Sequence, residues 1–241
     1  MLAAVIAAAA ALWVPSPTDT VQVQLQGKVD TSVAADVFYV DGDGTPAKTV
    51  AALHDAGAHA VCYFSAGSYE NYRSDADAFP KQTLGKKLDG YPDERWLDVR
   101  RVGALMKVMG PRLDECAAKG FDAADFDNVD GYQNDTGFPI TFGQQLRYDR
   151  RLAREAHARG LTASLKNDVG QLAQLAGAFD FALNEECLVY DECRRYKPFV
   201  DAGKAVFHIE YRGEWDKPCA YPGLSSIRKT FALRARPLER C

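Results

Sequence analysis

The sequence predicts a single α/β domain of the (β/α)8 TIM-barrel type, and three observations support this prediction. Polar, helix-like stretches end at a glycine and are followed within a few residues by an apolar run, at Gly57, Gly120, Gly160 and Gly203. Glycine just past a helix readily adopts the left-handed conformation that ends it, and alternating helices and strands are typical of a parallel sheet. The apolar runs alternate little, as expected of strands covered on both faces. Eight candidate strands favour a closed barrel over an open doubly wound sheet, and no GxGxxG turn follows the first strand.

The predicted elements follow the chain in order. Strands are expected at residues 21–26, 36–41, 59–65, 123–129, 161–167, 179–186, 205–211 and about 226–233. The first helix is predicted to have Thr45 as its cap and Pro46 as its first residue, and further helices are predicted at 101–119, 143–159 and 191–202. Residues 65–100 contain several glycines and prolines, so we expect mainly loop with one short helix, of the kind that shapes the mouth of an active site.

The N-terminal segment and the charge indicate an exported protein that does not bind nucleic acid. Leu2 to Val14 is an unbroken apolar run, too short to span a bilayer and similar to the core of a secretory signal, although the basic start is missing. We therefore assign residues 1–20 to a signal-like segment with its linker and 21–241 to the barrel, and expect a secreted monomer without a transmembrane span. The net charge of -4 and the lack of a basic run argue against a nucleic-acid partner.

The chain has six cysteines. An even number of cysteines allows all of them to pair in disulfides, which favours an oxidising compartment. Cys187 and Cys193 are close enough in sequence to close a small loop, and Cys219 and Cys241 could tie the tail back. Cys62 and Cys116 fall in a strand-like and a helix-like run, and we interpret them as buried thiols. The spacing does not resemble paired zinc knuckles.

Polar residues follow six of the predicted strands at their carboxyl ends. Barrel enzymes hold their active sites on this rim, because the carboxyl ends of all the parallel strands meet there. The residues are Asp41 and Asp43, Ser65, Asp127 and Asn128, Lys166 and Asn167, Asn184 to Glu186, and Glu210 and Tyr211. The sequence therefore predicts one polar pocket at this end of the barrel.

The chemistry that this rim supports is carboxylate chemistry. The four histidines form no HxH or HExxH pair, so neither an imidazole-held metal nor another cofactor is expected. No GxSxG elbow and no phosphate-binding loop is present. Two acids across a pocket, one protonated and one ionised, are the groups that hydrolyse glycosidic bonds.

The stretch FDAADFDNVDGY supplies the first acid. Asp125 and Asp127 are two residues apart on a strand, so both point to the same side, with Asp125 one layer deeper as a partner of Asp127. Glu185 and Glu186 compete for the second position, because adjacent strand residues face opposite sides and only one of them should enter the pocket.

Several long motifs resemble glycoside hydrolase family 114, the endo-α-1,4-polygalactosaminidases. They are YFSAGSYENYRSDA at 63–76, ERWLDVR at 94–100, DNVDGYQNDTGFPIT at 127–141, LKND at 165–168, FDFALNEECLVYDEC at 179–193 and KAVFHIEY at 204–211. The resemblance implies a TIM-barrel-type fold and places the family's catalytic Asp and Glu on Asp127 and Glu185, without deciding which is the acid. The sequence departs from the family pattern in its first strand, where Val21 and Val23 replace aromatic residues, and at Asp125-Phe126, which replaces Glu-Pro.

The resemblance implies a cationic or partly acetylated galactosamine polysaccharide as substrate, and an acidic rim would attract such a chain. Arg73, Arg95 and Arg100 are interpreted as anchors of the long loop. The expected substrate-binding residues are Asp41, Asp43, Asp125, Asn128, Tyr132, Lys166, Asn167, Glu210 and Tyr211, with Lys166 expected to pair with a carboxylate. Two alternatives stay open: a barrel that binds the polymer without cleaving it, and a glycosidase that acts on another α-linked polysaccharide.

Overall fold

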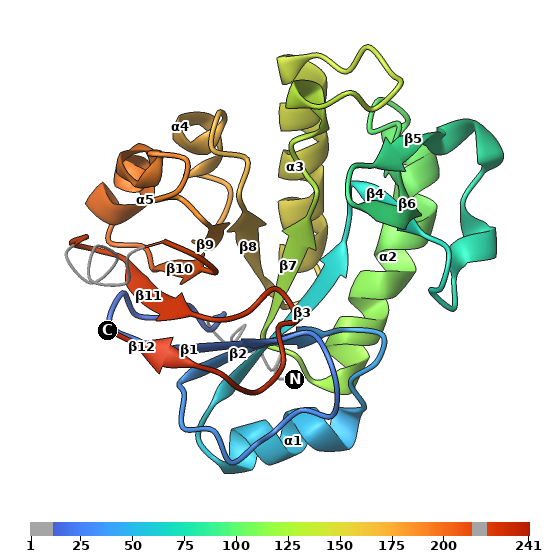
Figure 1. The fold of residues 1–241 in the computed structure, drawn as a ribbon. Coiled ribbons are helices and arrows are strands. Elements are labelled where there is room, and N and C mark those ends of the chain that lie inside the picture. Colours follow the sequence, from blue (N-terminus) through green and yellow to red (C-terminus); the bar gives the residue numbers. More distant parts are fainter. Residues whose placement is uncertain (1–11, 214–220) are drawn as a thin grey trace, which may run out of the picture.

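The computed structural model describes residues 12–213 and 221–241, and its main feature is a curled sheet of nine strands (Figure 1). Eight strands run parallel and pair in chain order, and each overlaps one of the predicted strands. They are β1 Val21–Gln24, β2 Val37–Asp41, β3 His59–Ser65, β7 Ala123–Asp127, β8 Thr162–Lys166, β9 Phe181–Glu185, β10 Val206–Glu210 and β11 Ser225–Arg228. The ninth strand, β12 Glu239–Arg240, pairs antiparallel with β11. The predicted fold class is confirmed.

The first and the last of the parallel strands, β1 and β11, meet without a shared strand ladder. The Lys229 ammonium donates to Gln22 Oε1 at 2.7 Å, and the Leu25 N–H donates to the carbonyl oxygen of Leu233 at 3.0 Å. The segment that follows β11 therefore joins the last parallel strand to the first, which curls the sheet into a barrel-like form.

Two apolar clusters lie on opposite faces of the sheet, as the weak alternation of the strands predicts. The inner cluster is built mainly from strand residues, and Tyr39, Phe181 and Phe207 pack there edge to face. The outer cluster joins the other strand face to the helices, for example Phe126 with Leu113 and Leu152. Both strand faces are thus buried below the rim.

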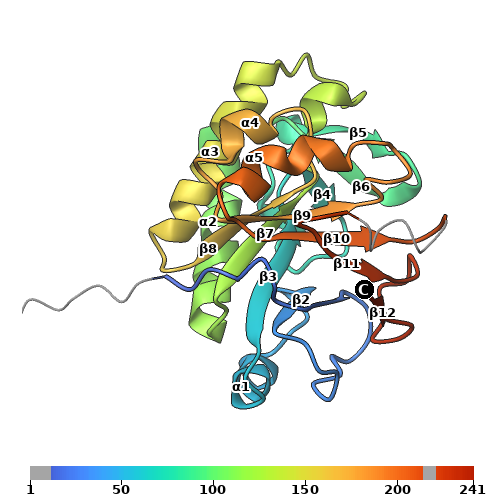
Figure 2. The same ribbon diagram turned by 90° about the vertical axis from the view of Figure 1, so that its left-hand side faces the viewer.

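Five α-helices are present in the described residues. They are α1 Ala47–Asp55, α2 Val102–Lys119, α3 Phe142–His157, α4 Leu172–Leu175 and α5 Lys197–Asp201, with α2 to α5 on the outer face of the curled sheet (Figures 1 and 2). Gly120 ends α2 with φ 86°, which is the left-handed conformation expected of it. Thr141 begins α3 with a capping box that it forms with Gln144.

Two helix predictions need correction. Helix α1 begins one residue later than predicted, because Pro46 has the extended conformation of the cap position. The helix predicted at 191–202 is shorter and in two parts, a 3-10 turn at Cys193–Tyr196 followed by α5. Pro198 lies in the first turn of α5, where its missing N–H is tolerated, and this favours a new helix start at that point.

The expectation of a loop over 65–100 was wrong. Strands β4 Ser68–Glu70, β5 Leu84–Leu88 and β6 Tyr91–Leu97 form a small antiparallel sheet in the order β4-β6-β5, with 3-10 turns at Ala76–Ala78 and Lys81–Thr83. Asp89 and Gly90 connect β5 to β6, and Gly90 has φ 78°. An Asp-Gly pair between two strand-like runs is a strong hairpin signal, because glycine supplies the positive φ that such turns need.

The disulfides agree with the sequence in one case and not in another. Cys187 and Cys193 form the predicted small loop. Cys62 and Cys116 are not buried thiols, because they form a disulfide that links β3 to α2. The pairing predicted for Cys219 with Cys241 involves a residue outside the described part of the chain.

Most of the signal-like segment also lies outside the described residues. The part that is described packs on the barrel, where Trp13 stacks on His59 with ring centres 4.2 Å apart. Within residues 12–213 and 221–241, none of the helices combines the length and apolarity that crossing a membrane requires.

Candidate active site

The strand register determines which side chains reach the rim. On β7, Ala123 packs in the inner apolar cluster, so Asp125 and Asp127 point inward above it. On β9, Phe181 and Leu183 pack in the same cluster, and Glu185 is the next inward position. Parallel strands therefore raise these carboxyl groups to the open end of the barrel, above an apolar floor.

A cleft of about 780 Å³ lies at this end. Its walls carry seven carboxylates and five aromatic rings, and the small β4-β6-β5 sheet supplies one side. The acidic lining residues are Asp41, Glu70, Asp93, Glu94, Asp127, Glu185 and Glu186, and the aromatic ones are Tyr63, Tyr72, Tyr91, Tyr211 and Phe231.

Lys166 lies between the two predicted catalytic acids. Its Nζ is 3.2 Å from Asp127 Oδ1 and 3.0 Å from Glu185 Oε2. The Lys166 side chain is only 3% exposed, whereas those of Asp127 and Glu185 are 19% and 25% exposed. Burial lowers the pKa of Lys166, but the surrounding carboxylates outweigh this and raise it well above its usual value, so the ammonium stays charged.

Asp127 is held in its ionised form. Tyr63 donates its hydroxyl to Oδ2 at 2.6 Å, and the Asn128 N–H donates to Oδ1 at 2.9 Å. Burial raises the pKa of Asp127, but the Lys166 ammonium and these two donors outweigh the burial and hold the pKa below its usual value.

Glu185 is oriented from the opposite wall. The Tyr211 hydroxyl donates to its Oε1, and Tyr211 in turn stacks on Phe231 with ring centres 4.4 Å apart. The backbone N–H of Glu185 donates to Asn167 Oδ1 at 2.9 Å. Asn167 therefore positions the backbone of Glu185 and does not itself line the cleft.

Asp125 lies one layer below the rim, as the spacing predicts. It is fully buried beside the Ser164 hydroxyl. Burial raises its pKa to about 7, with the Lys166 ammonium opposing that shift. Asp125 therefore lies beneath the cleft, where its charge acts on Lys166, and it does not line the cleft itself.

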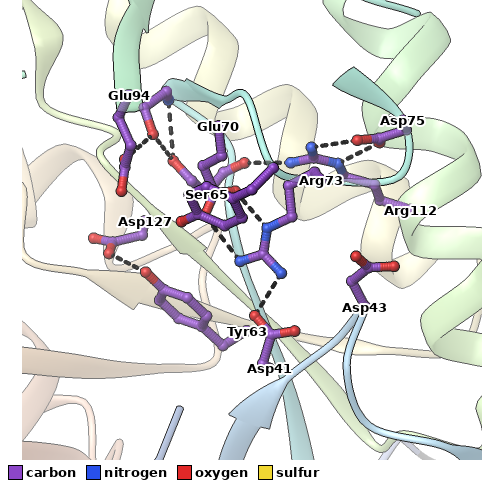
Figure 3. A network of polar contacts seen from close by, with 12 residues as sticks. Asp41, Asp43, Tyr63, Ser65, Glu70, Arg73, Asp75, Glu94, Arg112 and Asp127 are labelled. Atoms are coloured by element: carbon purple, nitrogen blue, oxygen red, sulfur yellow. Dashed lines mark hydrogen bonds and ion pairs between the residues drawn. The ribbon is translucent and has the colours of Figure 1, made fainter. Parts of the chain in front are cut away.

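Arg73 forms the side of the cleft next to the small sheet. Its guanidinium binds Asp41 Oδ2 at 2.6 Å and Glu70 Oε2 at 2.8 Å (Figure 3). Tyr72 donates its hydroxyl to Glu70 Oε1 at 2.7 Å. Arg73 anchors its loop, as the sequence predicts, and it also neutralises two acids of the cleft.

Glu94 on β6 was missed by the sequence analysis. Its Oε2 accepts a hydrogen bond from Ser68 Oγ at 2.8 Å, and Ser68 Oγ accepts one from Asn128 Nδ2 at 3.1 Å. Asn128 follows Asp127 directly, so this chain of contacts joins the small sheet to the end of β7. The sequence does contain a signal for this position of Glu94. The Asp89-Gly90 pair predicts a hairpin turn, and a hairpin turn there places residues 91–97 on a strand.

Three other predicted binding residues lie away from the cleft. Asp43 is on the far side of Arg73 and accepts a hydrogen bond from Ser74 Oγ (Figure 3). Tyr132 packs edge to face on Phe142. Glu210 is buried against His208, with Oε1 2.9 Å from the ring nitrogen Nε2.

Glu186 does not follow the expected alternation. It has φ 60°, so the chain has left the strand conformation, and it lines the cleft together with Glu185. Arg212 binds it at 2.8 Å. Both acids therefore reach the cleft, and Glu185 is the one that shares Lys166 with Asp127.

The first-strand residues that differ from the family pattern lie in the barrel interior. Val21 and Val23 are buried in the inner apolar cluster, and neither lines the cleft. Leu25, one inward position further along, does line it.

A metal-ligand arrangement occurs at one place in residues 12–213 and 221–241. It comprises Cys187, Cys193 and His208, whose ligand atoms lie within 4.8 Å of one another. The two sulfurs form a disulfide, so they offer no thiolate to a metal in this state.

Comparisons with known proteins agree with this fold. The chain is similar to the crystal structure of Aspergillus fumigatus Ega3 in complex with galactosamine, at 35% identity and a TM-score of 0.90 over 97% of this chain and 99% of that one. It shares its fold with the glycoside hydrolase domain of PelA from Pseudomonas aeruginosa, at 14% identity and a TM-score of 0.68 over 89% and 95% of the two chains. No curated protein sequence gives a significant match. The sequence profile of glycoside-hydrolase family GH114 matches residues 3–236, and this chain therefore belongs to that family and is a glycoside hydrolase, as its motifs predict.

Proposed function

We propose that this protein is a secreted, endo-acting hydrolase of α-1,4-linked galactosamine polysaccharide that uses Asp127 and Glu185 and no metal. The observation that carries the proposal is the Lys166 ammonium, which contacts both carboxylates at the bottom of an acidic cleft. The galactosamine named in the Ega3 complex supports the same class of substrate. A cleft lined by seven carboxylates attracts a polymer that carries free amines.

The distances favour a retaining mechanism. Both carboxylate oxygens lie within 3.2 Å of the same nitrogen, so they cannot be separated by more than about twice that distance. Retaining glycosidases have carboxyl groups about 5–5.5 Å apart, whereas inverting enzymes need about 6.5–9.5 Å to admit a water molecule.

The two acids take different roles in this mechanism. Asp127 is ionised, so it attacks the anomeric carbon while Glu185 gives its proton to the leaving glycosidic oxygen. This step forms a glycosyl ester on Asp127 and releases the shortened chain. Glu185 then takes a proton from water, the water oxygen attacks the anomeric carbon, and the Asp127 carboxylate leaves. Lys166 stabilises whichever of the two carboxylates is charged, Asp127 before the attack and Glu185 once it has given up its proton.

A reducing-end assay on partly deacetylated α-1,4-polygalactosamine tests the proposal. The wild type should release oligosaccharides, and Asp127→Asn and Glu185→Gln should each lower the rate by about three orders of magnitude or more. Glu115→Gln is the matched control, because Glu115 is exposed on α2, where it pairs with Lys119. Proton NMR of the first product should show the α-anomer before mutarotation.

The same assay decides between the alternatives. If the protein binds the polymer but releases no new reducing ends, the barrel is a binding protein and not a hydrolase. The loss of aromatic residues from the first strand is the feature that favours this non-catalytic alternative. Val21 and Val23 lie in the barrel interior and not in the cleft, which weakens that argument. Cleavage of a neutral α-linked polymer, with no loss of rate at high salt, would indicate a different substrate, because salt screens the attraction of a cationic chain.

A further inference from the structure

Most carboxylates of the cleft already have a cationic partner. The pairs are Arg73 with Asp41 and Glu70, Lys166 with Asp127 and Glu185, and Arg212 with Glu186. Two lining acids, Asp93 and Glu94, have no cationic partner among the residues that the structure describes. Asp93 is exposed and accepts a hydrogen bond from Asn71. Glu94 is half-buried, and burying a carboxylate without a counter-ion costs free energy, whereas the exposed Asp93 is solvated by water.

The two oxygens of Glu94 have different environments. Oε2 is held by the Ser68 hydroxyl at 2.8 Å, and Ser68 is itself fixed by Ser65 Oγ at 2.6 Å. No residue of the described part donates a hydrogen bond to Oε1. The carboxylate is therefore fixed in orientation by one oxygen, while the other remains available to a ligand in the cleft.

The strand register places a second acid beside it. Glu94 on β6 pairs directly with Glu70 on β4 in the antiparallel ladder. Like charges directly opposite each other on a sheet are destabilising, and Arg73 contacts Glu70 alone of the two. Arg73 therefore reaches Glu94 only as a nearby charge, and Glu94 has no direct counter-ion in the described part of the chain.

We propose that Glu94 binds the ammonium group of the substrate's galactosamine unit and selects deacetylated over N-acetylated residues. The inference rests on the proposed function for the class of substrate, and it adds the residue that recognises the amine. A free amine is protonated near neutral pH and supplies both the charge and the donors that Glu94 Oε1 lacks. An acetamido group is neutral and larger, so it cannot balance this carboxylate.

The ionisation of Glu94 is consistent with this assignment. Burial raises the pKa of Glu94, and the nearby charges of Glu70 and Asp127 raise it further. Asp127 is the nucleophile in the proposed mechanism, so the Glu94 carboxylate lies near the sugar that reacts. An ammonium bound there would favour the ionised form of Glu94 and neutralise an otherwise unbalanced charge.

The kinetic test compares substrates that differ only in acetylation. Wild type, Glu94→Gln and the control Glu115→Gln are assayed on fully deacetylated and fully N-acetylated α-1,4-galactosamine oligosaccharides of equal length. Glu94→Gln should lower kcat/KM on the deacetylated oligosaccharide by about 10- to 100-fold, chiefly through KM, and leave the acetylated one unchanged or faster. Glu94→Asp keeps the charge and should restore part of the loss. Equal losses on both substrates, or no loss on the deacetylated one, would overturn the assignment.

A binding test separates this inference from the proposed function. Isothermal titration with the same two oligosaccharides is carried out on Asp127→Asn and on Asp127→Asn combined with Glu94→Gln. The second change should weaken binding of the deacetylated chain by about tenfold or more and leave the acetylated chain unaffected. If the wild type cleaves neither substrate but this difference appears, the hydrolase proposal fails and the amine site stands. If cleavage occurs and the difference is absent, the amine site fails alone.

Discussion

The hydroxyl of Tyr63 donates to Asp127 at 2.6 Å across two neighbouring strands. In the register of β3 with β7, Tyr63 pairs with Asp125, so its phenol reaches up from the layer below Asp127. Burial and the Asp127 charge raise the pKa of Tyr63 well above its usual value, so it remains a donor over the whole working range of pH. The contact stabilises the ionised form of Asp127 selectively.

Replacing Tyr63 by Phe should move the acidic limb of the pH profile. The nucleophile acts as the carboxylate, so activity falls below the pKa of Asp127. Loss of the donor raises that pKa and shifts the acidic limb of kcat/KM to higher pH, so the loss of activity should be largest on that limb and small at neutral pH. Tyr69→Phe is the matched control, because Tyr69 packs on Phe79 and does not line the cleft. An unmoved acidic limb would show that the hydroxyl does not control Asp127.

Replacing Lys166 by Met should reduce both activity and stability. The change leaves Asp127 and Glu185 facing each other without a counter-ion, and removing one partner of a buried ion pair costs about 3–5 kcal/mol. We expect kcat/KM to fall by about 100-fold or more and the free energy of unfolding in urea to fall by about 3 kcal/mol. Combining Lys166→Met with Asp127→Asn should restore stability but not activity.

The surface pair of Lys197 with Asp201 supplies the comparison for Lys166. Lys197→Met removes a lysine whose side chain is 73% exposed, and such pairs contribute less than about 1 kcal/mol. A similar loss of stability in both variants would contradict the role given to the buried ammonium.

The inner face of the sheet was accessible from the sequence, because it follows from strand periodicity. Spacing alone puts Asp125 and Asp127 on one face, and the structure places both inside the barrel. Periodicity stops being informative where the strands end. Asn128, Asn167 and Glu186 follow their strands with φ 60°, 50° and 60°, which is uncommon for residues with a side chain and redirects the chain. This explains why Asn167 turns toward backbone and why Glu186 joins Glu185 in the cleft.

Contacts between distant segments were not accessible in the same way. Glu94 reaches the cleft because β4 is held against Asn128, just past the end of β7, and β6 pairs with β4. The register shifts between β5 and β6 obscure the alternation of that hairpin. The Cys62–Cys116 disulfide joins residues 54 apart, and cysteine spacing in a sequence does not determine such pairings.

The stability of the protein should decrease as pH rises from about 4 to about 8, because two buried acids share a site behind the catalytic strands. Asp149 on α3 and Asp168 after β8 lie within hydrogen-bonding reach of each other, which requires a proton on one of them. Burial raises the pKa of Asp168 to about 8, and burial with the Asp168 charge raises that of Asp149 well above its usual value. The folded state therefore binds protons that the unfolded chain has lost above about pH 4, and raising the pH destabilises it.

Asp149→Asn tests this pair, because an amide can donate to Asp168 without a shared proton. Urea unfolding between pH 5 and pH 8.5 should give a clearly shallower decline in the free energy of unfolding than in the wild type. Asp55→Asn, on the exposed end of α1, should keep the wild-type slope. A slope unchanged in Asp149→Asn would place the pH dependence elsewhere.

The two described disulfides should differ in what they stabilise. The Cys62–Cys116 link closes a loop of 54 residues, and loop-closure entropy predicts a contribution of about 4 kcal/mol. The Cys187–Cys193 link spans 6 residues, and the same relation gives about 2 kcal/mol.

The smaller disulfide should matter more for activity, because Cys187 lies two residues after Glu185. Replacing both Cys187 and Cys193 by serine should lower activity in the reducing-end assay at 25 °C, where the fold persists. The Cys62→Ser, Cys116→Ser variant should show the opposite pattern, with a larger loss in urea unfolding and near-normal activity while folded. Loss of activity in proportion to stability in both variants would mean that the small loop does not position Glu185.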